Sequence, residues 1–422
     1  MNRLLVYWNK QIVGTLSRHT RGRVQFQYSE DWFEKIGRSI SVSLPCLKEK
    51  HSPGVSTAFF ENLLPESDAR SILAFNRRFD KKDTFAFLEC FGEDCAGALS
   101  IIPEEEEPDF TPGKYENIDS ALNDALSKIQ TDPKKHQLYP EMKNARLSIA
   151  GAQDKLPVYI EGDNFYLPLN SGSATTHIIK PASPYYPNIQ RNEAFCMDLA
   201  FCVGLKVPSS RLIKIGGHEI FVIERYDRKK VNNNIIRVHQ EDFCQAMGVP
   251  VNRKYQEKGG PGFAQCRELV DEYLSDQGFD IRRTLVLIMV FNYLIGNHDA
   301  HGKNFSIIHE QEIEMAPFYD LVSTQVYPNL EAKFAMAIGQ TFRYDRIKEH
   351  SFIAFARDLK IRPRKLGELM GGMVESVSNA YGSTLSNHEK EYGPSTIYQD
   401  LSNVIQANIK HLEILIDSAW AK

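Results

Sequence analysis

The hydrophobic pattern of this chain changes character near Gln240. Before that residue, short runs of apolar and alternating residues are bounded by turn-forming residues, which is typical of strands. After it, the pattern is mostly helical, as in Ile281–Gly296 and Ile397–Trp420. We therefore expect an α+β protein with a β-rich region followed by a mostly helical C-terminal lobe.

The length of 422 residues leaves room for two or three domains at roughly 150 residues each. We expect an N-terminal β-rich subdomain in residues 1–110, which runs into the acidic, proline-punctuated stretch Pro103–Gly113. Residues 111–145 are expected to form a linker and a connector helix. Residues 146–238 would then form a second β-rich lobe, and residues 239–422 the helical lobe.

Turn-forming residues between apolar runs predict three hairpins. Two strands in the helical part and a helix directly after Gln240 are expected as well. The hairpins are expected at Leu4–Trp8 with Gln11–Leu16, Lys155–Ile160 with Phe165–Leu169, and Arg211–Ile215 with Glu219–Arg225; the later strands at Phe305–His309 and Ile313–Ala316; and the helix at Glu241–Met247.

Charge and composition exclude several classes of protein. The 54 acidic and 50 basic residues give a net charge of −4, so bulk charge does not favour nucleic-acid binding, which would need a local patch or a partner. The longest apolar stretch, Leu285–Ile295, is far shorter than the ~20 residues of a membrane span. The polar N-terminus lacks a secretory signal, and seven cysteines without Cys-x-x-Cys exclude a disulfide framework and a cysteine zinc site. We expect a reduced, soluble, cytoplasmic protein without a membrane partner.

A polar loop, Asn297–Asn304, lies between the apolar helix that ends at Ile295 and the strand that begins at Phe305. Loops presented by rigid elements often carry function. Asp299 and Asn304 show the Asp-x-x-x-x-Asn spacing of a phosphotransferase catalytic loop. There the aspartate takes the proton of the acceptor hydroxyl, and the asparagine oxygen holds a metal ion. Because this spacing is common, it is informative only together with other motifs.

Two further charged residues fit the same chemistry. Asp320 could hold Mg²⁺ jointly with Asn304, because hard cations take oxygen ligands; alternatively it merely caps a turn. Lys180 ends the predicted strand His177–Lys180, where a half-buried ammonium group needs an anionic partner such as an ATP phosphate or Glu193. The alternative is a surface lysine whose stem covers apolar surface.

Two segments are less specific. Small residues around Gly151, in Ser148–Lys155, would let backbone N–H groups approach a phosphate, although the segment is neither Gly-x-Gly-x-x-Gly nor a Walker A motif. Glu224–Arg228 lies at the junction of the lobes, where Tyr226 could flank an adenine. Structural salt bridges explain its charge pattern equally well.

The order of these pieces is more informative than any one of them, because it is the chain order of a bilobal kinase. The sequence resembles the HipA-type serine/threonine kinase toxins of bacterial toxin–antitoxin modules, over nearly its full length. The matching strings are Ser148-Ile-Ala-Gly-Ala-Gln-Asp-Lys155, His177-Ile-Ile-Lys-Pro181, Asn192-Glu193, Glu224-Arg-Tyr-Asp-Arg228, His239-Gln-Glu-Asp-Phe243, Gly296-Asn-His-Asp-Ala-His-Gly-Lys-Asn-Phe-Ser306 and Tyr319-Asp320.

The resemblance implies a kinase-like fold related to the phosphoinositide kinases, with ATP and Mg²⁺ as cofactors and residues 146–238 as the nucleotide-binding lobe. By position, Asp299 would be the catalytic base, Lys180 and His301 would lie at the ATP phosphates, and Asn304 and Asp320 would bind Mg²⁺. The remaining nucleotide-pocket residues would be Ala150, Gly151, Ala152, Gln153, Glu224, Tyr226 and Gln240. The sequence differs from ordinary protein kinases in lacking His-Arg-Asp and Asp-Phe-Gly.

The resemblance also implies regulation and partners. Ser148 matches the family's autophosphorylation site, and a phosphate there would add about −1.5 to −2 charges to the loop that must hold ATP, which would switch the enzyme off. The implied partners are a HipB-like helix-turn-helix antitoxin, operator DNA bound through that antitoxin, and a translation component as substrate, typically an aminoacyl-tRNA synthetase. Phosphorylation of the substrate would arrest growth, and the toxin and antitoxin would together repress their operon.

Direct DNA contact would need a basic patch, and two clusters are candidates. Basic clusters are usually solvated faces, so a structural role is the simpler interpretation of either. The first cluster consists of Lys360, Arg362, Arg364 and Lys365, and the second of Arg77, Arg78, Lys81 and Lys82.

Two other functions compete with the kinase. His239, His298, Asp299 and Asp320 mimic the ligand set of HD-type metal-dependent phosphohydrolases, but that fold is all helical and leaves Lys180 and Asn304 without a role. A catalytically inactive co-repressor is the third possibility. The presence of all the expected catalytic residues argues against it.

Overall fold

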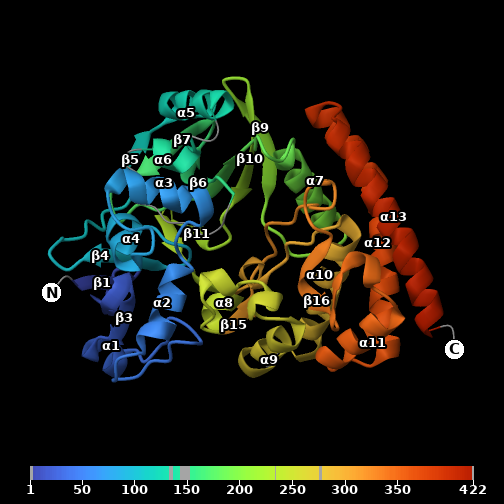
Figure 1. Cartoon of the computed structure of the whole chain (residues 1–422). Helices are drawn as coiled ribbons and strands as arrows, with labels where there is room; N and C mark the ends of the chain where they lie inside the picture. The colour runs from blue at the N-terminus through green and yellow to red at the C-terminus, as the bar shows by residue number, and fades with distance from the viewer. Residues whose placement is uncertain (1–2, 133–135, 143–152, 233, 275–277, 421–422) are drawn as a thin grey trace. The chain divides into compact units, whose positions relative to one another are not determined.

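The computed structural model of the chain describes residues 3–132, 136–142, 153–232, 234–274 and 278–420 (Figure 1). The chain forms two compact units. The first consists of Met1–Pro184, Ile213–Asn252 and Ile307–Gln311, and the second of Tyr185–Leu212, Arg253–Ser306 and Glu312–Lys422. The first unit carries most of the strands and the second most of the long helices, so the expected α+β class is confirmed.

The first unit begins with an antiparallel sheet of four strands in the order β3-β2-β1-β4. The expected turn at Asn9 is present, and Asn9 has a φ of 54°, a left-handed conformation in which Asn is enriched. Four helices accompany this sheet. The elements are β1 (Arg3–Trp8), β2 (Gln11–Arg18), β3 (Val24–Tyr28), β4 (Leu99–Pro103), α1 (Glu30–Lys35), α2 (Pro53–Glu61), α3 (Ser67–Arg77) and α4 (Thr84–Phe91).

The starts of these helices follow from local sequence. The hydroxyl of Ser52 accepts a hydrogen bond from the N–H of Val55, and Pro53 occupies the first turn of α2, a position where its missing N–H costs nothing. Asp83 caps α4 in the same way through the N–H of Ala86. The two helices thereby present phenylalanines to the sheet, including Phe59, Phe60, Phe85 and Phe87, all fully buried in the core.

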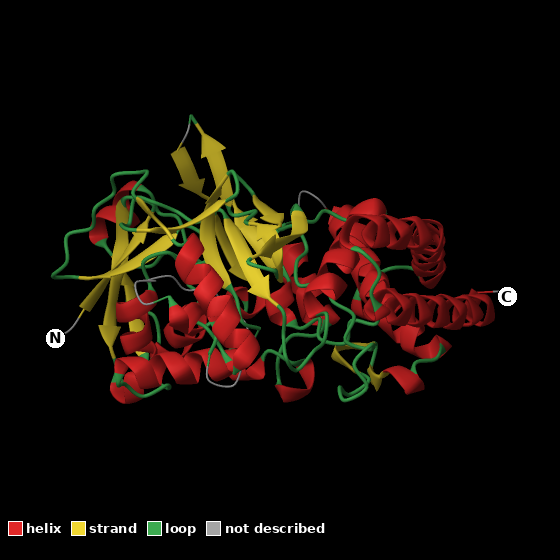
Figure 2. Cartoon of the chain, turned by 90° about the horizontal axis from the view of Figure 1, so that it is seen from above, coloured by secondary structure: helices red, strands yellow, loops and turns green. Residues whose placement is uncertain are grey.

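A second sheet of six strands has the order β5-β7-β6-β8-β10-β9. It contains the other two predicted hairpins, and the arrows of both sheets are visible in Figure 2. Its strands are β5 (Tyr115–Asn117), β6 (Leu156–Glu161), β7 (Asn164–Pro168), β8 (His177–Pro181), β9 (Ser210–Ile215) and β10 (His218–Glu224), and its helices are α5 (Asp119–Thr131) and α6 (Leu138–Glu141).

The prediction of a helix at Glu241–Met247 is wrong for its first residues. The structure has a strand, β13 (His239–Asp242), followed by a single helical turn, α8 (Phe243–Ala246). The helix begins only there because Asp242 and Gln245 form a capping box, each side chain accepting from the other's backbone N–H. A hairpin that the sequence pattern did not predict, β11 (Arg228–Val231) with β12 (Asn234–Arg237), precedes β13.

The second unit is mainly a set of helices around α10 (Gly278–Ile295), of which nearly every residue from Leu285 onward is buried. Helices α12 and α13 pack against α10 and against each other, as Figure 1 shows. The remaining elements include a second unpredicted hairpin, β16 with β17. The bounds are α7 (Ile189–Cys202), α9 (Phe263–Tyr273), α11 (Glu349–Asp358), α12 (Pro363–Tyr392), α13 (Thr396–Trp420), β15 (Ile313–Met315), β16 (Lys333–Ile338) and β17 (Thr341–Arg343). Strand β14 (Ser306–His309) lies mostly in the first unit.

Within the described ranges, none of the helices combines the length and apolar character that crossing a membrane requires.

Candidate active site

Lys180 lies on β8, a central strand of the six-stranded sheet, opposite Phe221 on β10. Only 4% of Lys180 is exposed, which rules out a surface lysine. Its Nζ is 5.9 Å from the centroid of the Phe221 ring. A buried ammonium group is costly unless an anion compensates it, so this lysine has a defined place in the interior of the sheet.

Tyr226 and Gln240, both predicted to line a nucleotide pocket, are in direct contact. The Tyr226 hydroxyl donates a short hydrogen bond to Oε1 of Gln240. Glu224, the last residue of β10, is exposed. The neighbours Arg225, Asp227 and Arg228 are instead buried in ion pairs, so for them the salt-bridge interpretation is correct. Within this segment Arg225, Asp227 and Arg228 therefore have a structural role, whereas Glu224 is exposed.

The predicted catalytic loop begins where α10 ends. Gly296 has a φ of +70°, and a Cβ there would lie 2.6 Å from Oε1 of Gln325, so only glycine fits the turn out of the helix. Asn297 then holds the loop from both sides: its Nδ2 donates to Oδ1 of Asn292 at 2.9 Å, and its Oδ1 accepts from the N–H of Asp299 at 3.1 Å. The loop is therefore fixed before it reaches Asp299.

Asp299 is exposed, yet its carboxylate is held by one tyrosine. The hydroxyl of Tyr255 donates to Oδ1 of Asp299 at 2.8 Å, and the N–H of Gly302 donates to the carbonyl of Lys254 at 3.4 Å. The Tyr255 ring also packs edge-on against buried His301, with centroids 5.2 Å apart. Sequence reasoning missed Tyr255, because no spacing links it to a residue 44 positions away. It is a positioning residue for Asp299.

The structure brings the segments of Asn304 and Asp320 together. The Tyr319 hydroxyl donates to the carbonyl of Lys303 at 2.7 Å and lies 2.6 Å from the hydroxyl of Ser306. The residues immediately before Asn304 and Asp320 are thus hydrogen-bonded to each other. Asp320 has a φ of 58°, which is uncommon for a residue other than glycine and is maintained by its surroundings.

Asn192 supports the same region. This fully buried residue of α7 forms two hydrogen bonds to the backbone of Ser323, both at 2.9 Å. Its Nδ2 donates to the Ser323 carbonyl, and its Oδ1 accepts from the Ser323 N–H. The backbone three residues after Asp320 is therefore anchored to α7. Glu193, the expected carboxylate on the same helix, is also buried.

The donor set of Asn304 and Asp320 fits a hard divalent cation. Nδ2 of Asn304 donates to the carbonyl of Asp299 at 3.3 Å, which fixes the amide and assigns its other atom, Oδ1, the role of acceptor. One amide oxygen and one carboxylate suit Mg²⁺, which usually binds one or two carboxylates together with substrate phosphates.

Several predicted residues lie elsewhere. Ser148, Ala150, Gly151 and Ala152 fall outside the described residues. Gln153 is described and half-buried. Of the basic cluster on the helical lobe, Lys360, Arg362 and Arg364 are exposed, but Glu368 lies 3.7 Å from Arg364 and 3.0 Å from Lys365. That carboxylate offsets part of the charge that DNA would need.

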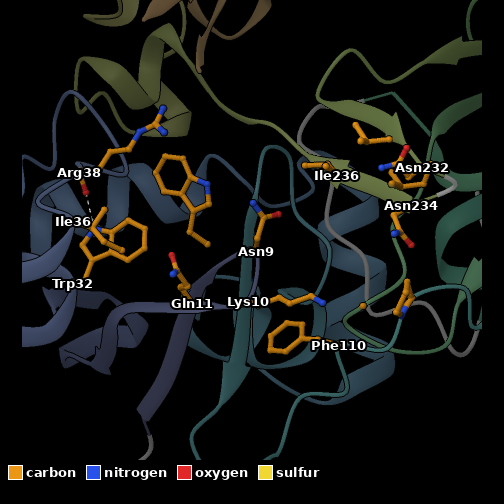
Figure 3. Close-up of a pocket in the computed structure, with 15 residues that line it drawn as sticks. Asn9, Lys10, Gln11, Trp32, Ile36, Arg38, Phe110, Asn232, Asn234 and Ile236 are labelled. Atoms are coloured by element: carbon orange, nitrogen blue, oxygen red, sulfur yellow. Dashed lines mark hydrogen bonds between the residues drawn. The ribbon is translucent and has the colours of Figure 1, made fainter. Parts of the chain in front are cut away.

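A cavity of about 730 Å³ in the first unit contains none of the predicted site residues. Trp8, Trp32 and Phe110 contribute rings to it, and the Arg38 guanidinium lies 4.7 Å above the Trp8 ring. Figure 3 shows Arg38 and Trp32 on one side and the β11–β12 residues Asn232, Asn234 and Ile236 on the other.

The histidines of the hydrolase alternative have structural roles. His239 is hydrogen-bonded through Nε2 to the carbonyl of Ile40 at 2.7 Å, and burial lowers its pKa to about 3. The His298 ring packs 4.8 Å from Phe334, and burial lowers its pKa to about 4. Among the described residues no three or more His, Cys, Asp or Glu side chains gather to hold a metal ion. The structure gives this alternative no support.

The structure thus holds Asp299 by Tyr255 and brings the segments of Asn304 and Asp320 together, and these are residue types that phosphoryl transfer uses. Family models match the chain twice: the HipA N-terminal domain over residues 4–102 and the HipA-like C-terminal domain over residues 147–381. The chain belongs to the HipA family of serine/threonine kinase toxins.

Two relatives agree with this assignment, and a solved structure shares the fold. The putative kinase Y4mE of Sinorhizobium fredii is 35% identical over 98% of this chain and 99% of its own. The serine/threonine-protein kinase toxin HipA of Shewanella oneidensis is 30% identical over 80% of this chain and 78% of its own. The fold matches HipA in the Shewanella oneidensis HipA, HipB and operator DNA complex with a TM-score of 0.84 and 24% identity, over 99% of both chains.

Proposed function

We propose that the chain transfers the γ-phosphate of ATP to a serine or threonine hydroxyl of a protein in the cytoplasm. The observation that carries this proposal is the Tyr319–Lys303 hydrogen bond, because it joins the loop of Asp299 and Asn304 to Asp320. Kinase relatives support ATP as the phosphate donor.

In the proposed step, the acceptor hydroxyl oxygen bonds to the γ-phosphorus while the bond from that phosphorus to the β–γ bridging oxygen breaks. Asp299 takes the hydroxyl proton, ADP leaves, and Lys180 and His301 neutralise phosphate charge. Asn304 and Asp320 would hold Mg²⁺, which supplies further charge neutralisation when bound. Catalysis by positioning and electrostatics is what phosphoryl transfer requires, and Glu224, Tyr226, Gln240 and the Ala150–Gln153 segment would hold the nucleotide.

Regulation by self-phosphorylation is part of the proposal. Phosphate on Ser148 would place negative charge in the loop that binds the ATP phosphates and would repel the nucleotide. Self-phosphorylation would then switch the enzyme off.

The partners are proposed from relatives. The solved complex of the Shewanella oneidensis protein contains HipB and operator DNA, which supports a HipB-like helix-turn-helix antitoxin and joint repression of the operon. A translation component, above all an aminoacyl-tRNA synthetase, is the proposed substrate. Its phosphorylation would arrest growth.

Phosphopeptide mapping after incubation with Mg²⁺–ATP tests the self-phosphorylation. The wild type is compared with Asp299→Asn and with the control Asp345→Asn, which alters an exposed aspartate paired with Arg343 at 2.9 Å. We expect phosphate on Ser148 in the wild type and the control, and none in Asp299→Asn. Phosphate in all three would remove Asp299 from the mechanism, and its absence from all three, starting from unmodified protein, would favour an inactive co-repressor.

A further inference from the structure

A cluster of charged side chains is buried in the first unit. It comprises three arginines and two aspartates, each at most 8% exposed, and is called here the Arg/Asp cluster. Asp94 Oδ1 accepts from Arg228 Nη2 at 2.8 Å and from Arg237 Nε at 3.0 Å. Asp227 accepts from Arg225 at 2.8 and 2.9 Å and lies 2.9 Å from Arg228.

The Arg/Asp cluster joins three stretches that are distant in sequence. From the N-terminal domain, Asp94 contributes its carboxylate and Gly97 its N–H, which donates to Asp227 Oδ2 at 2.7 Å. From the stretch before β8, Thr175 donates through its hydroxyl to Asp94 Oδ2 at 2.8 Å. From β12, Arg237 donates to the carbonyls of Ser171 and Ser173 at 2.9 and 3.0 Å.

The backbone of the N-terminal domain lies very close to that of Gln240 at Gly97. A Cβ on Gly97, which has a φ of +78°, would lie 2.9 Å from the backbone nitrogen of Gln240. The N-terminal domain therefore approaches the backbone of a proposed nucleotide residue directly. Burial alone would raise the pKa of Asp94, but Arg228, Arg237 and Arg225 hold it well below its ordinary value, so this carboxylate remains charged.

Three proposed nucleotide-binding residues, Tyr226, Gln240 and Lys180, are connected to this arrangement. Tyr226 stands between Arg225 and Asp227, both held by the cluster, and its own hydroxyl reaches Gln240. The N–H of Arg225 donates to the carbonyl of Thr176 at 2.9 Å. Thr176 directly follows Thr175, whose hydroxyl donates to Asp94. Thr176 immediately precedes β8, so a shift there is transmitted along the strand to Lys180.

We propose that Asp94 is a positioning residue for ATP, supplied by the N-terminal domain to fix Tyr226, Gln240 and Lys180 in their binding arrangement. This inference rests on the proposed kinase function. It makes the N-terminal domain part of the nucleotide-binding machinery, because the C-terminal family domain supplies only Asp227 to the three arginines and the second carboxylate, Asp94, comes from the N-terminal domain.

Steady-state kinetics of the full-length Asp94→Asn variant test the inference. We expect the KM for ATP to rise about tenfold while kcat changes less than about twofold, because nucleotide groups are displaced and Asp299 is not. The matched control is Asp109→Asn, which removes an exposed carboxylate paired with Lys114 at 2.7 Å and should leave both constants unchanged. If the KM for ATP is unchanged in Asp94→Asn, the inference is overturned. This holds even if kcat is lower, because a lower kcat alone reports a loss of folded enzyme.

A second variant covers the case in which Asp94→Asn does not fold. The double variant Asp94→Asn/Arg237→Gln removes one charge of each sign and retains the original excess of one positive charge, but it replaces the carboxylate that accepts from Thr175 and Arg228 with a neutral amide. We expect it to fold and to bind ATP about tenfold more weakly than the wild type, measured with a fluorescent ATP analogue. A folded double variant with wild-type affinity overturns the inference. A wild type that neither binds ATP nor transfers phosphate overturns the kinase proposal as well.

Discussion

The hydroxyl of Tyr319 donates to the backbone carbonyl of Lys303 over 2.7 Å. This bond connects the residues that directly precede Asp320 and Asn304. One tyrosine side chain therefore joins the segments of the two proposed oxygen ligands of the metal ion, and its hydroxyl also lies 2.6 Å from that of Ser306. A change at Tyr319 should affect metal use before it affects stability.

We expect Tyr319→Phe to weaken the apparent affinity for Mg²⁺ about tenfold, while the lost hydrogen bond destabilises the fold by only about 1 kcal/mol. The measurement is phosphoryl transfer as a function of Mg²⁺ at saturating ATP. Tyr381→Phe is the control, because it removes a tyrosine hydroxyl that accepts from Gln406 at 3.0 Å. Equal Mg²⁺ dependence in both variants would show that the Tyr319 brace is not needed.

Tyr255 should act on the chemical step and not on nucleotide binding. Tyr255→Phe removes the 2.8 Å hydrogen bond to Asp299, so the carboxylate loses its orientation. We expect kcat to fall about tenfold with little change in the KM for ATP. A rise in KM without a change in kcat would instead place Tyr255 in the nucleotide pocket.

Asn192 should prove important for stability. In Asn192→Asp, a carboxylate oxygen would face the carbonyl of Ser323 where Nδ2 now donates at 2.9 Å, and the new charge would be buried. We expect a loss of about 3 kcal/mol in the free energy of unfolding, followed by urea denaturation. The control is Asn403→Asp, an exposed asparagine that accepts from Gln399 at 3.0 Å, and equal midpoints would contradict the prediction.

His298 should make the protein less stable in acid. Its folded-state pKa is lowered to about 4 from the ordinary 6.5, so below pH 6.5 the unfolded chain binds a proton that the folded protein does not. Stability is therefore complete above pH 6.5 and is lost as the pH falls towards 4. This histidine accounts for a loss of about 2 kcal/mol between pH 7 and pH 5.

The measurement is the urea midpoint at pH 7 and pH 5. His298→Gln should show a smaller decrease between the two pH values than the wild type. His350→Gln, which changes an exposed histidine on α11, should show the full decrease. An identical decrease in all three proteins would contradict the assignment to His298.

The parts of the fold with a strong local signal were predictable. The turn at Asn9, the helix caps at Ser52 and Asp83 and the continuous apolar run of α10 each follow from neighbouring residues. The hairpin of β11 and β12 was not predicted, because its residues are mostly polar and exposed and show no alternation. The predicted start of this helix, Glu241, was two residues too early. The helix α8 begins at Phe243 because Asp242 and Gln245 form a capping box there.

The site shows the same division. The order of motifs along the chain and the family resemblance predict Asp299, Asn304, Asp320 and Lys180 as site residues, and these assignments remain predictions. The sequence did not predict the long-range hydrogen bonds around these residues. Tyr255, Asn192 and Asp94 have partners 44, 131 and 134 residues away, and such pairs leave no spacing that a single sequence can reveal.

The most direct test of the account is the initial rate of γ-phosphate transfer from Mg²⁺–ATP to serine or threonine in protein. It compares the wild type with Asp299→Asn and the exposed control Asp345→Asn. The account predicts a loss of about 10³-fold in Asp299→Asn, as expected for removal of a general base, and a wild-type rate in the control. A wild-type rate in Asp299→Asn would contradict the account.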